Sequence, residues 1–275
     1  MASLDYHPRL CAVTKNLSPD FADAVRKVER ANYHIAEFDA AAERYFSKRP
    51  TQVTMTPVVR RGVHGFAVGD RLGFPDKGMA LFIGDIVHNL RCALDYLITA
   101  CAVHNGKRTN STEFPFVKAG GRKSDLNKGI YKARDADPRA EKLVWKARPY
   151  PRGNTLLVAL NELDRFDKHR LIVAVASQVE VEVTTGGYNE LPMDRLKGMR
   201  RKGRTGFMPV KEGYELALAV DMHFRSEIVF ARGGPLAGKP CLPALKAMSG
   251  AVADVIKTFE DEYGTIAFAR SLPRT

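Results

Sequence analysis

The chain has few cysteines, and none of them pairs with a neighbour at a metal-binding or redox spacing. The four cysteines are Cys11, Cys92, Cys101 and Cys241. On a single helix Cys92 and Cys101 would lie about 13 Å apart along the axis, too far for a disulfide bond. We therefore expect four reduced thiols, as in a cytoplasmic protein.

Long apolar runs are also missing. Residues 1–7 lack the apolar core of a signal peptide. No run approaches the roughly 18 consecutive apolar residues that a membrane span needs. We expect a cytoplasmic protein with no membrane partner.

Several sequence fingerprints are absent. The glycines fit neither the dinucleotide-binding pattern nor the phosphate-binding loop, and no strand-helix-strand alternation appears. The serine nucleophile motif is missing too, and Cys92 and Cys101 have the helical spacing of small core residues. These absences argue against a nucleotide-binding sheet and a cysteine or serine nucleophile, and we expect no cofactor.

Acidic residues are outnumbered, since the formal net charge is +12. A protein with this excess attracts polyanions, and RNA is the nucleic acid we favour. One run has no acidic residue: Lys197, Arg200, Arg201, Lys202 and Arg204 lie between glycines. The run is either a nucleic-acid-binding segment or a solvated loop. It contains no aromatic residue, which argues against a stacking platform for single strands.

The apolar periodicity predicts four long helices, at about 18–49, 76–105, 154–176 and 243–263. The first is expected to begin at Ser18 and Pro19. Segments rich in β-branched residues predict strands at about 51–70, 178–185 and 214–231. Residues 106–150 are expected to be a loop with a short helix near 139–146. Together these elements predict one α+β domain over 1–275, a bundle of long amphipathic helices with a small antiparallel sheet.

One carboxylate falls within an apolar helical stripe. Asp167 shares helical spacing with Leu160 and Leu163, so we expect it to face the core. An unpaired charge there costs several kcal/mol, so Asp167 requires a cation or a raised pKa. We expect Arg91, on another helix, to be that cation, because a guanidinium can hold a carboxylate with two parallel hydrogen bonds.

The candidate catalytic residues are therefore His88, Arg91, Asp95, Asp167 and His169. Steps of three and four place the first three on one side of a helix. The group is either an interhelical lock or an acid-base centre in which a histidine carries the proton. Metal binding by His88, Asp95, Asp167 and His169 is disfavoured, because His169 lies about 200° around the helix from Asp167. We expect no metal.

Three segments together resemble a family of uncharacterised bacterial proteins. They are residues 84–96, the Phe114–Phe116 loop and the segment Asp167, Lys168, His169, Arg170. That resemblance spans about residues 84–170 and implies no reaction. The 84–96 helix also resembles HEPN-type domains. These helical bundles often act as metal-independent ribonucleases or as nucleic-acid-binding partners, and their signature is arginine followed by histidine after four to six residues. Here Tyr96 follows Arg91 where the histidine would be.

Three functional hypotheses follow. The first is a HEPN-like endoribonuclease in which Arg91, His88 and the Asp167 segment surround a scissile phosphate. The second is a non-catalytic nucleic-acid-binding or regulatory protein whose charged helix pair is structural. The third is a protein-interaction module. Paired amphipathic helices are also compatible with a symmetric homodimer.

Overall fold

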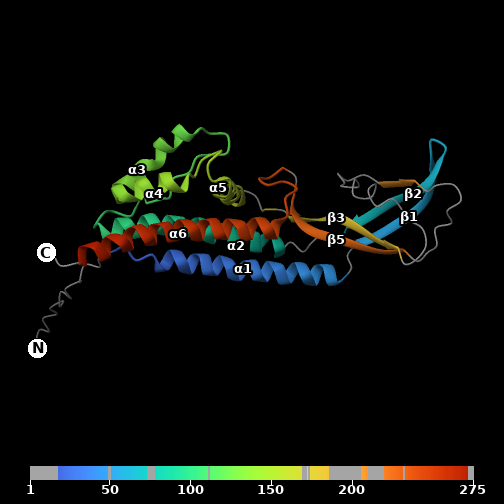
Figure 1. Cartoon of the computed structure of the whole chain (residues 1–275), viewed down its shortest axis with the longest axis horizontal. Coiled ribbons are helices and arrows are strands. Elements are labelled where there is room, and N and C mark those ends of the chain that lie inside the picture. The colour runs from blue at the N-terminus through green and yellow to red at the C-terminus, as the bar shows by residue number, and fades with distance from the viewer. Residues whose placement is uncertain are drawn as a thin grey trace, which may run out of the picture.

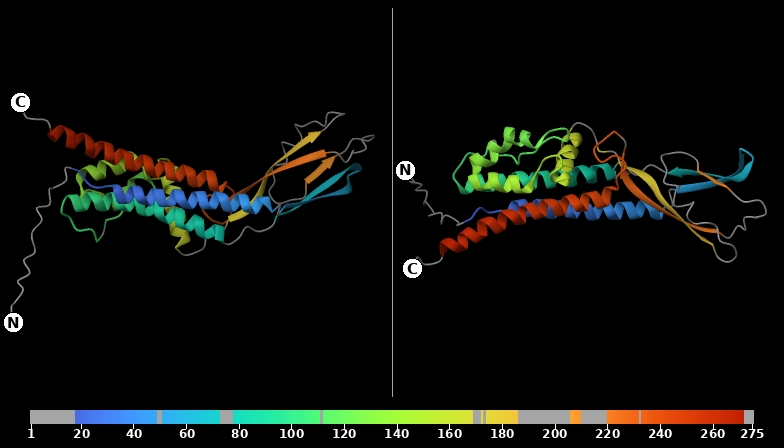
Figure 2. Two further views of the ribbon diagram at one scale, coloured as in Figure 1. Left: turned by 90° about the horizontal axis from the view of Figure 1, so that it is seen from below. Right: turned by 45° about the horizontal axis from the view of Figure 1, so that its top comes forward.

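Helices dominate the described part of the protein in a computed structural model (Figure 1). The structure describes residues 18–48, 51–72, 78–110, 112–168, 172, 174–185, 206–209, 220–231 and 233–271. The long helices α1 (Ala22–Ser47), α2 (Gly78–His104) and α6 (Cys241–Ser271) run side by side along the long axis. The shorter α3 (Asn127–Ala136), α4 (Pro138–Ala147) and α5 (Thr155–Asp167) cover one side of this layer (Figures 1 and 2).

Helix α2 forms the centre of the bundle. Its fully buried side chains include Ile86, Leu90, Leu94 and Ile98, which contact apolar residues of α1, α5 and α6 in one continuous core. It is also the one described helix that is long and apolar enough to cross a membrane, and 61% of its apolar window is buried inside the molecule. A helix that is apolar almost all round is typical of a core helix as well as of a membrane span.

The other long helices follow the predicted periodicity but differ in their ends. Helix α1 begins at Ala22, not at Ser18, and the carboxylate of Asp20 accepts a hydrogen bond from the Ala22 N–H. Helix α6 continues through Gly264 to Ser271, beyond the predicted end at residue 263. Helix α5 ends at Asp167, so the predicted helix over 154–176 is too long at its C-terminal end.

The 106–150 region is more helical than expected. The predicted short helix is α4, but a 3-10 turn, η1 (Lys123–Leu126), and α3 precede it. The Asp137 carboxylate accepts a hydrogen bond from the Arg139 backbone N–H and so caps α4. It also contacts the Arg139 guanidinium at 2.8 Å and Asn105 at the end of α2 at 3.0 Å. This cluster fixes α4 to the end of α2.

The predicted α+β fold is wrong. Among the described residues, strand β2 (Val63–Leu72) pairs with β1 (Thr51–Arg60) and with β4 (Gly206–Pro209), while β3 (Ala174–Thr185) pairs with β5 (Val220–Phe230) alone. The strands therefore form two separate thin ladders and not one sheet. The described strands extend beyond one end of the helices and do not lie along them as a layer (Figure 1). The packed body is a helical bundle.

Local sequence explains the turn of the β1–β2 hairpin and the attachment of the β3–β5 ladder to the helices. Arg61 and Gly62 join β1 to β2 with φ values of 53° and 77°, the left-handed pair of a tight two-residue hairpin turn. At the other ladder, the last residues of β5 enter the bundle, where Phe230 is buried in the core. The helices thus hold β5 by its inner end.

Candidate acid-base site on helix α2

A polar stripe runs along the solvent side of α2. His88, Cys92, Asp95 and Tyr96 lie on it at helical spacing, and none of them is buried. The side chains on either side, such as Leu90 and Ala93, are fully buried. The helix backbone is therefore held firmly while the stripe remains accessible.

The centre of the stripe is the His88 imidazole, whose side chain is 59% exposed. Its Nδ1 atom lies 3.5 Å from the Oδ1 atom of Asp164 on α5. Its Nε2 atom lies 3.5 Å from the Cys92 sulfur, one turn along α2. The two ring nitrogens thus face two different groups, a carboxylate and a thiol.

Asp164 is the buried carboxylate of α5, with only 4% of its side chain exposed. Its second oxygen lies 2.7 Å from the Lys168 ammonium, which is itself largely exposed. A carboxylate beside Nδ1 favours the tautomer with the proton on that nitrogen and leaves a lone pair on Nε2. An exposed imidazole oriented in this way can take and return a proton.

Arg91 lies one turn away and has a different environment. Its side chain is 7% exposed, and its guanidinium donates to the carboxylates of Asp95 and Glu113 and to the Phe114 carbonyl oxygen. The Phe116 ring lies under it, 4.6 Å from the guanidinium carbon to the ring centroid. These contacts hold the 113–116 loop on α2.

The carboxylates around Arg91 differ in their electrostatics. Burial raises the pKa of Asp95, although the Arg91 contact and the Phe114 N–H hydrogen bond oppose that shift. Burial also acts to raise the pKa of Glu113, but Lys132 and Arg91 outweigh it, so that pKa is lowered. Arg91 is therefore the shared cation of a structural lock.

The predicted pairing of Arg91 with Asp167 is wrong. Asp167 lies against Gly84, so closely that a β-carbon at that glycine would come within 2.6 Å of the Asp167 Oδ2 atom. Arg91 lies about two turns further along α2 and is occupied by the 113–114 loop. Among the ion pairs of the described residues, none includes Asp167.

The expectation that Asp167 faces the core is also wrong, because its side chain is only partly buried. Its pKa is nevertheless shifted, which is the alternative to a cation that the sequence left open. Partial burial raises the pKa of its carboxyl, and the charges of Asp164 and Asp85 add to this. The Ile172 backbone hydrogen bond and the nearby His88 oppose the shift. The upward shift of this pKa is the effect expected of a partly desolvated carboxylate that has no arginine beside it.

Two groups of candidate residues lie outside the described ranges. These are His169 and the basic run with Lys197, Arg200, Arg201, Lys202 and Arg204. Sequence reasoning also missed Asp164 and the thiol of Cys92. Asp164 is three residues from Asp167, so the two lie only about 60° apart on a helix, and periodicity alone does not separate them.

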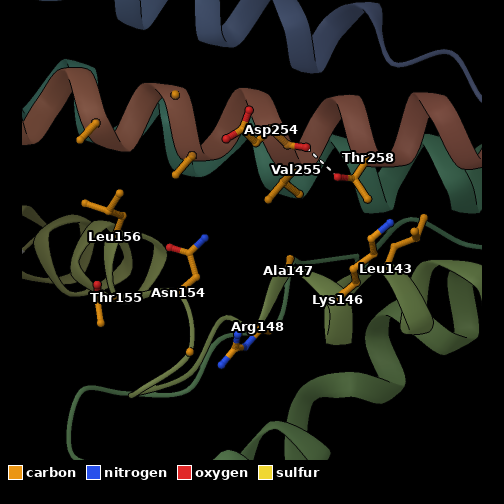
Figure 3. Close-up of a pocket in the computed structure, with 14 residues that line it drawn as sticks. Leu143, Lys146, Ala147, Arg148, Asn154, Thr155, Leu156, Asp254, Val255 and Thr258 are labelled. Carbon is orange, nitrogen blue, oxygen red and sulfur yellow. Dashed lines mark hydrogen bonds between the residues drawn. The ribbon is translucent and has the colours of Figure 1, made fainter.

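A groove elsewhere on the surface contains none of these residues. It has a volume of about 670 Å³ and lies between α6 and the segment joining α4 to α5 (Figure 3). Its walls combine apolar side chains such as Leu156 and Val255 with the polar groups of Lys146, Arg148 and Asp254. Beside His88 lies the buried carboxylate of Asp164. Among the described residues, no ion pair with a buried partner includes Lys146, Arg148 or Asp254 of the groove.

Compared with known proteins, the chain matches no family model, no curated protein and no solved structure. The likenesses noted from short motifs therefore have no support from a whole-chain relationship. The side chains on α2 and their neighbours are therefore the evidence for function.

Proposed function

We propose that the protein acts on nucleic acid, with RNA favoured, as a HEPN-like endoribonuclease that needs no metal. The observation that carries the proposal is the exposed His88 imidazole with the buried Asp164 carboxylate beside its Nδ1 atom. The net charge of +12 supports a polyanionic substrate.

The chemistry requires one proton acceptor and one proton donor. His88 Nε2 takes the proton of a ribose 2′-hydroxyl, whose oxygen then attacks the neighbouring phosphorus. The P–O5′ bond breaks, the imidazolium of His88 returns its proton to the leaving 5′-oxygen, and a 2′,3′-cyclic phosphate results. Lys168, whose side chain is 58% exposed, supplies a positive charge beside the imidazole for the phosphate.

Arg91 has a different role in this proposal from the one expected of it. Because its guanidinium is buried and occupied by Asp95, Glu113 and Phe114, it acts as a positioning residue and does not bind phosphate. Asp95 is likewise part of the lock. Asp167 shapes the electrostatics next to His88.

The test is incubation of the purified protein with single-stranded RNA and with DNA of the same sequence, each with and without EDTA. Cleavage of RNA alone, unaffected by EDTA, is expected. His88→Gln should reduce the rate by about 10² to 10⁴. The matched control is His104→Gln, a histidine in the last turn of the same helix. Equal cleavage by the His88 variant and the wild type would rule out the proposed role.

The second candidate is a non-catalytic nucleic-acid-binding protein, and the closed lock around Arg91 favours it. In that case no product forms, and binding depends on the basic run. Changing Arg200, Arg201 and Lys202 to glutamine should reduce the slope of log affinity against log salt by up to about one unit per lost phosphate contact. An unchanged slope would exclude the run from the interface.

We also propose a cytoplasmic location without a membrane partner. The burial of α2 in the bundle supports it, as do the free thiols of Cys92, Cys101 and Cys241. A homodimer stays a proposal that measurement of the mass in solution would test.

A further inference from the structure

The second neighbour of His88 is a thiol, and the distance between them is informative. Cys92 Sγ and His88 Nε2 are 3.5 Å apart. A tetrahedral zinc ion with bonds of about 2.0 to 2.1 Å to nitrogen and 2.3 Å to sulfur requires a separation of about 3.5 Å. The two atoms already have the spacing of adjacent ligands on one ion.

We propose that His88 and Cys92 form a binding site for a borderline-soft divalent cation of the zinc class. This goes beyond the absence of metal that the sequence suggested. Ligands four residues apart on a buried helix are fixed by its backbone and need no loop to order. Nitrogen with sulfur is the donor set that such ions prefer over Mg²⁺ or Ca²⁺.

The surroundings of the pair fit this use. Histidine ligands commonly donate their other ring N–H to a carboxylate, and Asp164 Oδ1 lies beside His88 Nδ1. Among the three described cysteines, Cys101 and Cys241 are buried in the core, and only Cys92 reaches the surface. The described residues contain no group of three or more ligating side chains, so water would complete the coordination of an ion held here.

A metal ligand describes Cys92 better than a nucleophile does. The thiol lies in the middle of α2, where the backbone N–H groups are used within the helix and offer no oxyanion site. A bound dication supplies the charge that releases the thiol proton.

The site shares its nitrogen with the proposed proton carrier. An ion on Nε2 occupies the lone pair that would accept the 2′-hydroxyl proton, so zinc should inhibit RNA cleavage and EDTA should restore it. This inhibitory consequence rests on the proposed function. The binding of the ion does not.

The test is a titration of the reduced, RNA-free protein with CoCl₂, followed by ZnCl₂. A cobalt-thiolate charge-transfer band in the near ultraviolet, removed by Zn²⁺, is expected from the wild type. Cys92→Ser should abolish the band, His88→Gln should weaken binding at least about tenfold, and Asp164→Asn should weaken it about 10- to 100-fold. His104→Gln should bind like the wild type.

A second measurement needs no variant. Zn²⁺ should slow alkylation of Cys92 by iodoacetamide in the wild type, as followed by mass spectrometry of the Cys92 peptide. A cobalt band that survives Cys92→Ser, or alkylation unaffected by Zn²⁺, would overturn the proposal. Because no RNA is present, a protein that binds cobalt but cleaves nothing would contradict only the ribonuclease proposal.

Discussion

Two buried carboxylates on opposite parts of the bundle have different partners. Asp137 and Asp164 expose only 5% and 4% of their side chains. Asp137 is held by Asn105, by a backbone N–H and by Arg139, which is 29% exposed. Asp164 faces His88 and Lys168, each of which is more than half exposed. We call a cluster closed when its partners are mostly buried and open when they are mostly exposed. A closed cluster stabilises the fold, while an open cluster leaves polar groups that a ligand can contact.

The Arg91 lock is of the closed kind, and breaking it should have the largest effect on stability. Arg91→Ala leaves Asp95 without an ion-pair partner and Glu113 with Lys132 alone, and it removes a buried guanidinium from the core, so we expect a loss of about 3 to 5 kcal/mol in the free energy of unfolding. Arg91→Lys should lose less. Urea denaturation measures both, with the surface variant Arg165→Ala as control. If Arg91→Ala lowers the free energy of unfolding no more than Arg165→Ala does, the Arg91 ion pairs do not stabilise the fold as proposed.

The Asp137 cluster should have the second largest effect on stability. Asp137→Ala should lower the free energy of unfolding by about 2 to 4 kcal/mol, because the change removes a helix cap and a buried partner of Arg139. The pKa of Asp137 is lowered to about 2, since its hydrogen bonds and the Arg139 charge outweigh the effect of burial. Its stabilisation is therefore complete above its ordinary pKa of 3.8 and falls between there and about 2.

Thermal melts from pH 6 down to pH 2 measure this dependence. As the pH falls toward 2, the melting temperature of Asp137→Ala should fall less than that of the wild type, because the variant has no Asp137 carboxylate to protonate. Asp135→Ala, at an exposed position nearby, is the control. Parallel curves for the wild type and Asp137→Ala would contradict the closed cluster.

The open site should respond in activity more than in stability. Asp164→Asn keeps the shape of the side chain but removes the charge beside His88 Nδ1, so we expect a loss of about tenfold in RNA cleavage. Rates under single-turnover conditions test this, with Glu162→Gln on the same helix as control. An unchanged rate would show that Asp164 does not orient the base.

The smallest effect is expected at Asp167. Because partial burial raises its folded-state pKa, ionisation of Asp167 costs stability once the pH rises above 3.8 and through the folded value. Asp167→Asn should therefore raise the melting temperature slightly at pH 7 and leave it unchanged near pH 3. A lower melting temperature at pH 7 would mean that an attractive partner holds the charge.

Much of the helical architecture could be predicted from the chain, and the site could be predicted in part. The periodicity located α1, α2 and α6 because their apolar residues repeat over many turns. It did not show that the strands form separate ladders, because pairing depends on contacts far apart in sequence. It named His88 but gave Arg91 the wrong partner, because Glu113 and Phe114 lie on a loop whose path has no periodic signal.

Both proposals depend on the carboxylate of Asp164 setting the tautomer of the His88 ring. Long-range ¹H–¹⁵N correlation spectroscopy of the histidine side chains measures this directly in the wild type and in Asp164→Asn. We predict that neutral His88 carries its proton on Nδ1 in the wild type and moves toward the Nε2–H form in the variant. A wild-type ring protonated on Nε2, or a tautomer unaffected by the substitution, would contradict the account.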